Sequence, residues 1–146
     1  AETAAFIREL RQEHDNLGIT LDQSHLYQLG EDAEESARLA GECIVHAHFA
    51  NCIVKDSSHA LYGDKHTPFS VPGGEVGPEQ IARFLEALAK SGYFSRPQPT
   101  RRPVVSLEVN VMSGEGSPEE IIQATKEAFL KGWELADLGI APRFEV

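Results

Sequence analysis

The chain has 146 residues, a formal net charge of −10 and 25% charged residues. This length is enough for one domain, here spanning residues 1–146, that buries about two-thirds of the surface of its unfolded chain. The acidic charge is scattered and no stripe of Lys or Arg opposes it, so nucleic acid is a poor partner, and the hydrophobic runs are too short to span a bilayer.

Helical and strand patterns alternate along the first half of the chain. Apolar residues at helical spacing predict a helix over Thr3–His14, and a two-residue alternation predicts a strand over Leu17–Asp22. A helix whose inner side is small is expected over Glu31–Glu42, and a second strand over Cys43–Phe49. Residues Ala50–Gly77 are rich in Gly, Pro, Asp, Ser and His, which predicts a long loop.

The second half continues the alternation. A helix is predicted from Pro78 to Ser91, because Pro is typical of a first helical position. Its inward stripe is Ile81, Phe84, Leu85 and Leu88. A connector leads to a third strand over Val104–Asn110, and Ser117 followed by Pro118 and Glu120 predicts the start of a last helix. We expect that helix to turn four side chains inward: Ile122, Phe129, Trp133 and Ala136.

This order predicts an α/β fold with about three parallel strands and four helices. Three strands are too few to close on themselves, and a full (β/α)8 barrel takes roughly 250 residues. We therefore expect βα units that form the C-terminal part of a TIM barrel, with a complementary N-terminal half-barrel or a second copy of the chain as partner.

The three predicted strands share one unusual property. In each, alternate side chains are apolar, whereas the opposite face carries polar groups near the C-terminal end of the strand. These polar groups are Asp22 and His25, His46 and His48, and Glu108. Mixed carboxylate and imidazole ligands suit a divalent ion such as Mn²⁺, Mg²⁺, Co²⁺ or Zn²⁺.

Each residue also has a plainer interpretation. Asp22 is as well suited to capping a turn as to binding a metal, and an isolated His25 is more often a surface histidine. One of His46 and His48 is a ligand candidate and the other a wall residue, with His48 nearer the strand end. Glu108 lies in an apolar run, where a buried carboxylate needs a metal or a cation.

Four motifs in order carry a resemblance to a known family. They are Thr20-Leu21-Asp22-Gln23-Ser24-His25, Val45-His46-Ala47-His48, Gly63-Asp64-Lys65-His66 with Gly73-Gly74-Glu75, and Val105-Ser106-Leu107-Glu108. Together they resemble the last three strands of the xylose isomerase-like superfamily, which includes sugar-phosphate isomerases and ketose 3-epimerases. The resemblance implies that Asp22, His48 and Glu108 bind a divalent metal, with a fourth ligand from an earlier strand.

The resemblance also implies roles for the remaining polar residues. Glu108 is the expected catalytic acid/base, and His25 and His46 are the expected substrate-binding residues. Asp64 and His66 match additional zinc ligands of the abasic-site endonucleases of the superfamily, although solvated loop residues are an equal alternative.

The implied function is metal-dependent isomerisation or epimerisation of a sugar or polyol. A metal ion polarises the carbonyl, and a nearby carboxylate moves the proton on the adjacent carbon. Two alternatives remain: a zinc-dependent hydrolase similar to abasic-site endonucleases, and a catalytically silent barrel fragment. Two cysteines without a CxxC pair favour a reducing compartment, so we expect a cytoplasmic protein.

Overall fold

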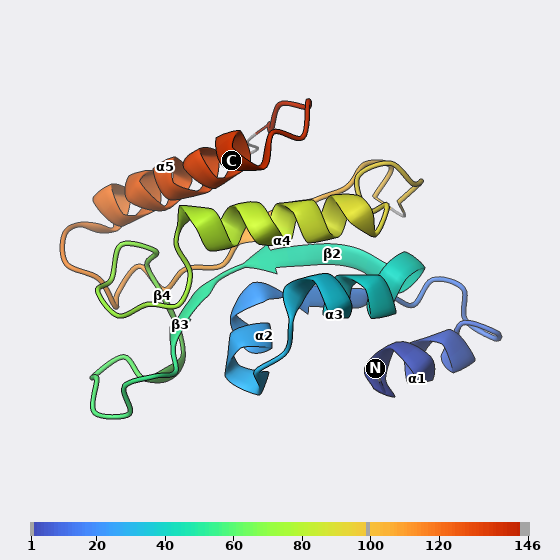
Figure 1. The fold of residues 1–146 in the computed structure, drawn as a ribbon, viewed down its shortest axis with the longest axis horizontal. Coiled ribbons are helices and arrows are strands. Elements are labelled where there is room, and N and C mark those ends of the chain that lie inside the picture. Colours follow the sequence, from blue (N-terminus) through green and yellow to red (C-terminus); the bar gives the residue numbers. More distant parts are fainter. Residues whose placement is uncertain (1, 99, 144–146) are drawn as a thin grey trace.

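The computed structural model describes residues 2–98 and 100–143 of the chain (Figure 1). The elements of the first half are α1 (Glu2–Leu10), β1 (Ile19–Asp22), α2 (Gln23–Leu29), α3 (Ala33–Ala40), a 3-10 turn η1 (Gly41–Cys43) and β2 (Ile44–Phe49). The elements of the second half are β3 (Asn51–Ile53), β4 (Gly63–Thr67), α4 (Pro78–Lys90), β5 (Val105–Leu107) and α5 (Pro118–Ala136).

The main sheet is parallel and has the order β1-β2-β5. Its register places Thr20 opposite His46, Asp22 opposite His48, and His48 opposite Ser106. Side chains directly opposite each other in a sheet share a face. The predicted separation into a polar and an apolar face is therefore confirmed, and so is an α/β architecture that matches part of a barrel.

The apolar face of the sheet packs against α4 and α5. Phe49 of β2 is fully buried, and its ring centroid lies 5.0 Å from that of Phe84 and 5.1 Å from that of Phe129. Figure 1 shows α4 and α5 side by side along this face. The predicted inward stripe of α4 is buried throughout, from Ile81 to Leu88.

Local sequence signals explain where α2 begins and ends and where α5 begins. Asp22 caps α2, and that helix ends at Gly30, whose φ of 67° lies in the left-handed region that Gly adopts at little cost. Ser117 and Glu120 form the predicted capping box at the start of α5.

Several predicted helices and strands were longer than the observed ones. Backbone hydrogen bonds decide where a helix or strand ends, and the periodicity of the sequence does not reveal them. The first helix ends at Leu10 and not at His14, and the third strand of the sheet ends at Leu107 and not at Asn110. Five α-helices are present in the described residues where four were expected, since the short helix α2 follows β1 directly.

The segment Ala50–Gly77 is not the irregular loop that was predicted. It contains β3 and β4, which pair antiparallel with Asn51 opposite Thr67. In Figure 1 this hairpin continues from the end of β2. The sequence did not predict this hairpin, because β4 contains residues such as Asp64 and Lys65, which are rare in strands.

At the start of α5, the residue predicted to face inward was wrong by one position. Ile122 is 46% exposed, whereas its neighbour Ile121 is buried. Phe129 is buried as expected, and Trp133 and Ala136 are partly buried against the core. Ile122 instead lines an apolar groove of about 770 Å³ between β5 and α5, along the edge of the sheet that pairs with no other described strand.

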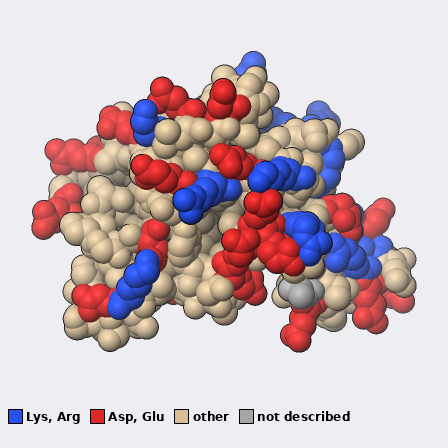
Figure 2. Space-filling model, in the orientation of Figure 1, with Lys and Arg blue, Asp and Glu red and all other residues tan. Residues whose placement is uncertain are grey.

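Charge is not segregated on the face of the molecule that Figure 2 shows, where Lys and Arg side chains are interleaved with Asp and Glu. Among the described residues, no helix is both long and apolar enough to cross a membrane.

Candidate metal centre

Asp22 stands at the junction of β1 and α2 and uses its two oxygens differently. Oδ1 accepts hydrogen bonds from the backbone N–H of Ser24 at 2.8 Å, from the Ser24 hydroxyl at 2.7 Å and from the backbone N–H of His25 at 3.2 Å. Oδ2 lies 3.4 Å from Nδ1 of His48 on the neighbouring strand. The capping role is thus confirmed, and because the other oxygen of this buried carboxylate faces His48, the metal-binding alternative stays a prediction beside it.

Asp22, His48 and Glu108 come together at the C-terminal edge of the parallel sheet. Each offers one ligand atom, and these atoms all lie within 4.8 Å of one another. Nδ1 of His48 is 2.5 Å from Oε2 of Glu108. The carboxyl ends of parallel strands converge in this way, so three sequence-distant segments supply one cluster.

Glu108 is less buried than its apolar sequence neighbours suggested. β5 ends at Leu107, and the Glu108 side chain is 41% exposed. Its carboxylate lies between two imidazoles, because Oε1 is 3.2 Å from Nδ1 of His66 while Oε2 faces His48. The expectation of a buried carboxylate is thus wrong, and the expectation of a metal or cation at Glu108 stays a prediction, since the structure places two imidazoles beside it.

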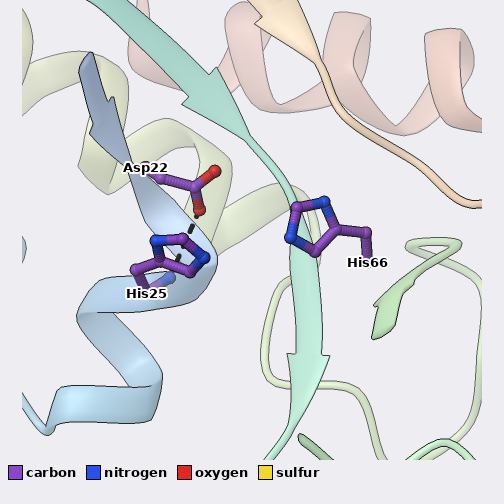
Figure 3. Close-up of side chains that lie close together, drawn as sticks. All are labelled: Asp22, His25 and His66. Atoms are coloured by element: carbon purple, nitrogen blue, oxygen red, sulfur yellow. Dashed lines mark hydrogen bonds between the residues drawn. The ribbon is translucent and has the colours of Figure 1, made fainter. Parts of the chain in front are cut away.

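A second cluster shares Asp22 with the first. It contains Asp22, His25 and His66, again with one ligand atom from each residue within 4.8 Å of the others. Figure 3 shows the two imidazoles, one from α2 and one from β4, on either side of the space next to the Asp22 carboxylate. Their ring centroids are 6.0 Å apart.

Asp64 borders this second cluster. Its carboxylate lies 2.8 Å from Nε2 of His66 and 3.6 Å from Nε2 of His25, and Nε2 of Gln28 donates to it at 3.1 Å. Burial acts to raise the pKa of Asp64, but the hydrogen bond from Gln28 and the two imidazoles outweigh it, so the pKa lies below its ordinary value. The hairpin thus brings Asp64 and His66 to the site.

His46 lies on the same sheet face but outside both clusters. Its Nε2 is 2.8 Å from the hydroxyl of Ser106, and its ring centroid is 4.7 Å from that of His48 in an edge-on contact. Burial, and then the nearby His48, lower the pKa of His46. The His46 ring, packed edge-on against His48, restricts how that ring can rotate.

The donor sets fit a divalent ion. Each cluster combines carboxylate oxygens with imidazole nitrogens, a mixture that suits borderline ions such as Zn²⁺ and Co²⁺ and also the harder Mn²⁺. Hydrogen bonds from Ser24 to Oδ1 hold the Asp22 carboxylate in place, as groups hydrogen-bonded to metal ligands commonly do.

Sequence reasoning missed the residues that orient the candidate ligands. Ser106 and Ser24 were named only within motifs and were given no role, and Gln28 was not considered as a support. Ser24 had a usable signal, because a Ser two residues after an Asp commonly takes part in an Asx turn. Gln28 had none, since its contact with Asp64 depends on the hairpin.

A family model described as xylose isomerase-like TIM barrel matches residues 1–132. No curated protein and no solved structure matches the chain significantly.

Proposed function

The chain belongs to the xylose isomerase-like TIM barrel family, and from this premise we propose that it supplies the metal-binding part of a sugar isomerase or epimerase. The observation that supports this function best is the convergence of Asp22, His48 and Glu108, whose ligand atoms lie within 4.8 Å of one another. The proposed substrate is a sugar or sugar-like polyol. Free thiols at Cys43 and Cys52 support the proposed cytoplasmic location.

In this proposal Glu108 both binds the ion and moves a proton, and the other residues have one task each. Asp22, His48 and Glu108 hold a divalent ion, which when bound polarises a substrate carbonyl and acidifies the adjacent C–H. A carboxylate oxygen of Glu108 takes the proton from that carbon and returns it. The exposure of Glu108 supports this role, because a base must reach the substrate. His25 and His46 bind substrate hydroxyl groups.

We expect Glu108→Gln to lower metal-dependent turnover by about 10²- to 10⁴-fold, because the amide cannot accept the proton. The assay follows solvent deuterium incorporation into a panel of ketoses and polyols by NMR, using the chain together with any complementary half-barrel. Glu115→Gln is the matched control, since Glu115 is an exposed carboxylate of the following loop. Equal turnover by Glu108→Gln and the control would remove Glu108 from the mechanism.

A second candidate function rests on the other cluster. Asp22, His25 and His66, with Asp64 beside them, provide ligands for a further ion, which favours a multi-metal hydrolase similar to abasic-site endonucleases. The net charge of −10 weighs against a DNA substrate. Incubation of the zinc-loaded protein with a duplex that contains one abasic site tests it. Cleavage without sugar turnover would replace the first proposal, and metal binding without either activity would support a catalytically silent fragment.

A further inference from the structure

His66 has a backbone conformation that its place on a strand does not explain. Its φ is 47°, in the left-handed region that residues with a Cβ seldom adopt. Such conformations persist where surrounding contacts hold them, and they are concentrated at ligand sites. The question is which contact holds His66.

The end of β5 provides that contact. The chain changes its hydrogen-bond partner there: the backbone N–H of Glu108 donates to the carbonyl of Phe49 in β2 at 3.0 Å, and the backbone N–H of Asn110 donates to the carbonyl of His66 in β4 at 2.7 Å. One short segment therefore joins the parallel sheet to the hairpin. Glu108, which faces both His48 and His66, provides the first of these two attachments.

The conformation of His66 has a consequence for its side chain. The ring contacts Glu108 through Nδ1 at 3.2 Å and Asp64 through Nε2 at 2.8 Å, and it offers a ligand atom to the cluster of Asp22 and His25. In an extended conformation the Cβ direction would change, and the ring would leave these three carboxylates. The backbone geometry of His66 thus decides whether the second cluster exists.

We propose that Asn110 is a positioning residue whose backbone N–H holds His66 in the left-handed conformation and so assembles the second metal position, formed by Asp22, His25 and His66. This inference rests on the second candidate function, because it requires that Asp22, His25 and His66 bind a further divalent ion, with His25 as a metal ligand and not a substrate-binding residue. The side chain of Asn110 has a different task, since its Oδ1 accepts a hydrogen bond from the backbone N–H of Met112 at 3.0 Å. The two roles can therefore be separated by substitution.

The test compares Asn110→Pro, which lacks the N–H, with Asn110→Ala, which keeps it. Co²⁺ is titrated into the 146-residue chain, and visible absorption with the NMR signals of the His25, His48 and His66 rings reports each position separately. We expect Asn110→Pro to weaken Co²⁺ binding at the second position by about 10- to 100-fold, the usual effect of losing a supporting group, and to leave the first position within about 2-fold. Asn110→Ala should leave both positions within about 3-fold of the unaltered chain, because the supporting N–H remains.

Equal affinity of the second position in Asn110→Pro and the unaltered chain would overturn the proposal, as would equal weakening by Asn110→Pro and Asn110→Ala. Absence of Co²⁺ binding at the second position of the unaltered chain would refute the second candidate function instead, and absence of binding at the Asp22, His48 and Glu108 position would refute the first.

Hydrogen exchange of the Asn110 amide in the unaltered chain keeps the test valid if Asn110→Pro does not fold. We expect this amide to exchange more slowly once Zn²⁺ fills the second position, because coupling between two equilibria is reciprocal. Exchange at the rate of an unstructured peptide in the zinc-loaded chain would overturn the proposal.

Discussion

At the scale of one residue, Asp22 caps a helix and, in the proposed function, also binds the ion. Its Oδ1 satisfies backbone N–H groups at the start of α2, which would otherwise lack partners, while Oδ2 faces His48. An Asp is suited to both, because Asp is among the best N-cap residues and is also a metal ligand. The two tasks differ in what they need: the cap needs an acceptor oxygen, whereas the ion needs negative charge.

We expect Asp22→Asn and Asp22→Ala to separate these tasks. Asn keeps an acceptor oxygen, so the free energy of unfolding should change little, while metal affinity falls because the charge is gone. Ala loses both, and the missing cap should cost about 1 kcal/mol. Chemical denaturation and a metal titration of each variant measure the two effects. Similar unfolding free energies for Asn and Ala would show that the cap contributes nothing.

Cys52 is a buried thiol close to the acidic residues of the site. Burial raises its pKa from the ordinary value of 9.0 to about 11, and the charges of Glu75, Asp64 and Asp22 act in the same direction. The folded chain therefore keeps the thiol protonated at a pH where the unfolded chain ionises it. Below pH 9 both states are neutral, so the difference affects stability only above that value.

The unfolding free energy should consequently fall as the pH rises from 9 to about 11, by at most about 3 kcal/mol from this thiol. Cys52→Ala should lack this part of the decrease, because no thiol remains to ionise in the unfolded state. Urea denaturation of both proteins at about pH 8, 9, 10 and 11 gives the comparison, and Cys43 is present in both. Parallel curves for the two proteins would contradict the prediction.

Gly132 controls the contact between two elements, α4 and α5. A Cβ at this position would lie 2.4 Å from the side chain of Ile81 and 2.9 Å from the carbonyl oxygen of Pro78, and the latter is backbone that cannot rotate away. The two helices approach closely here because residue 132 has no side chain. Residues from α4 and α5 form much of the core with Phe49, so this approach also fixes the sheet.

We expect Gly132→Ala to destabilise the chain by about 1–2 kcal/mol, because two opposing effects differ in size. Ala gains up to about 1 kcal/mol of helix propensity over Gly, but overpacking usually costs about 1–3 kcal/mol. Thermal unfolding followed by circular dichroism measures the change. Gln123→Ala, at an exposed position of the same helix, should stay within about 0.5 kcal/mol. A higher Tm for Gly132→Ala would show that the helices separate easily.

The elements also show why some of the fold was predictable from the sequence. The two-residue alternation at Thr20, Asp22, His46 and His48 predicted the correct sheet face, because register in a parallel sheet preserves alternation. The inward stripe of α4 was predicted equally well from the sequence. The hairpin was not, because Asp64 and Lys65 are poor strand formers that pair there only through tertiary contacts.

The residues of the candidate site also differ in how well the sequence predicted their positions. Asp22, His48 and Glu108 could be grouped from sequence because each lies at the end of a strand of one sheet. His66 could be named but not placed, since its position depends on the hairpin and on a left-handed backbone conformation that no sequence pattern indicated. The metal-binding role of both groups stays a prediction.

At the scale of the whole molecule, both edge strands of the parallel sheet lack a neighbour among the described residues. The backbone N–H of Glu108 points to β2, so the N–H of Leu107 points the opposite way, to the free edge. The apolar groove beside β5 includes Leu107, Ile122 and Trp133. An open strand edge with an apolar margin favours pairing with another strand.

We therefore expect the 146-residue chain by itself to associate, or to bind a complementary half-barrel. Analytical ultracentrifugation over a range of concentrations should reveal species heavier than the 16.0 kDa monomer. Leu107→Pro should reduce association, because Pro removes the outward N–H and is tolerated on an edge strand. Ser106→Pro is the contrasting variant, since it removes a bond to β2 and should unfold the sheet. A stable monomer at every concentration would contradict this expectation.

In the proposed metal centre, the cap that Asp22 forms limits how an engineer can change which ion the ligands prefer. Replacing Asp22 by a Cys or a His, the usual route to a softer metal, would also remove the N-cap of α2. This helix carries His25 and Gln28. Selectivity is better redesigned at Asp64, whose carboxylate caps no helix and is half exposed. A substitution at Asp64 therefore leaves the cap of α2 in place, whereas a substitution at Asp22 removes it.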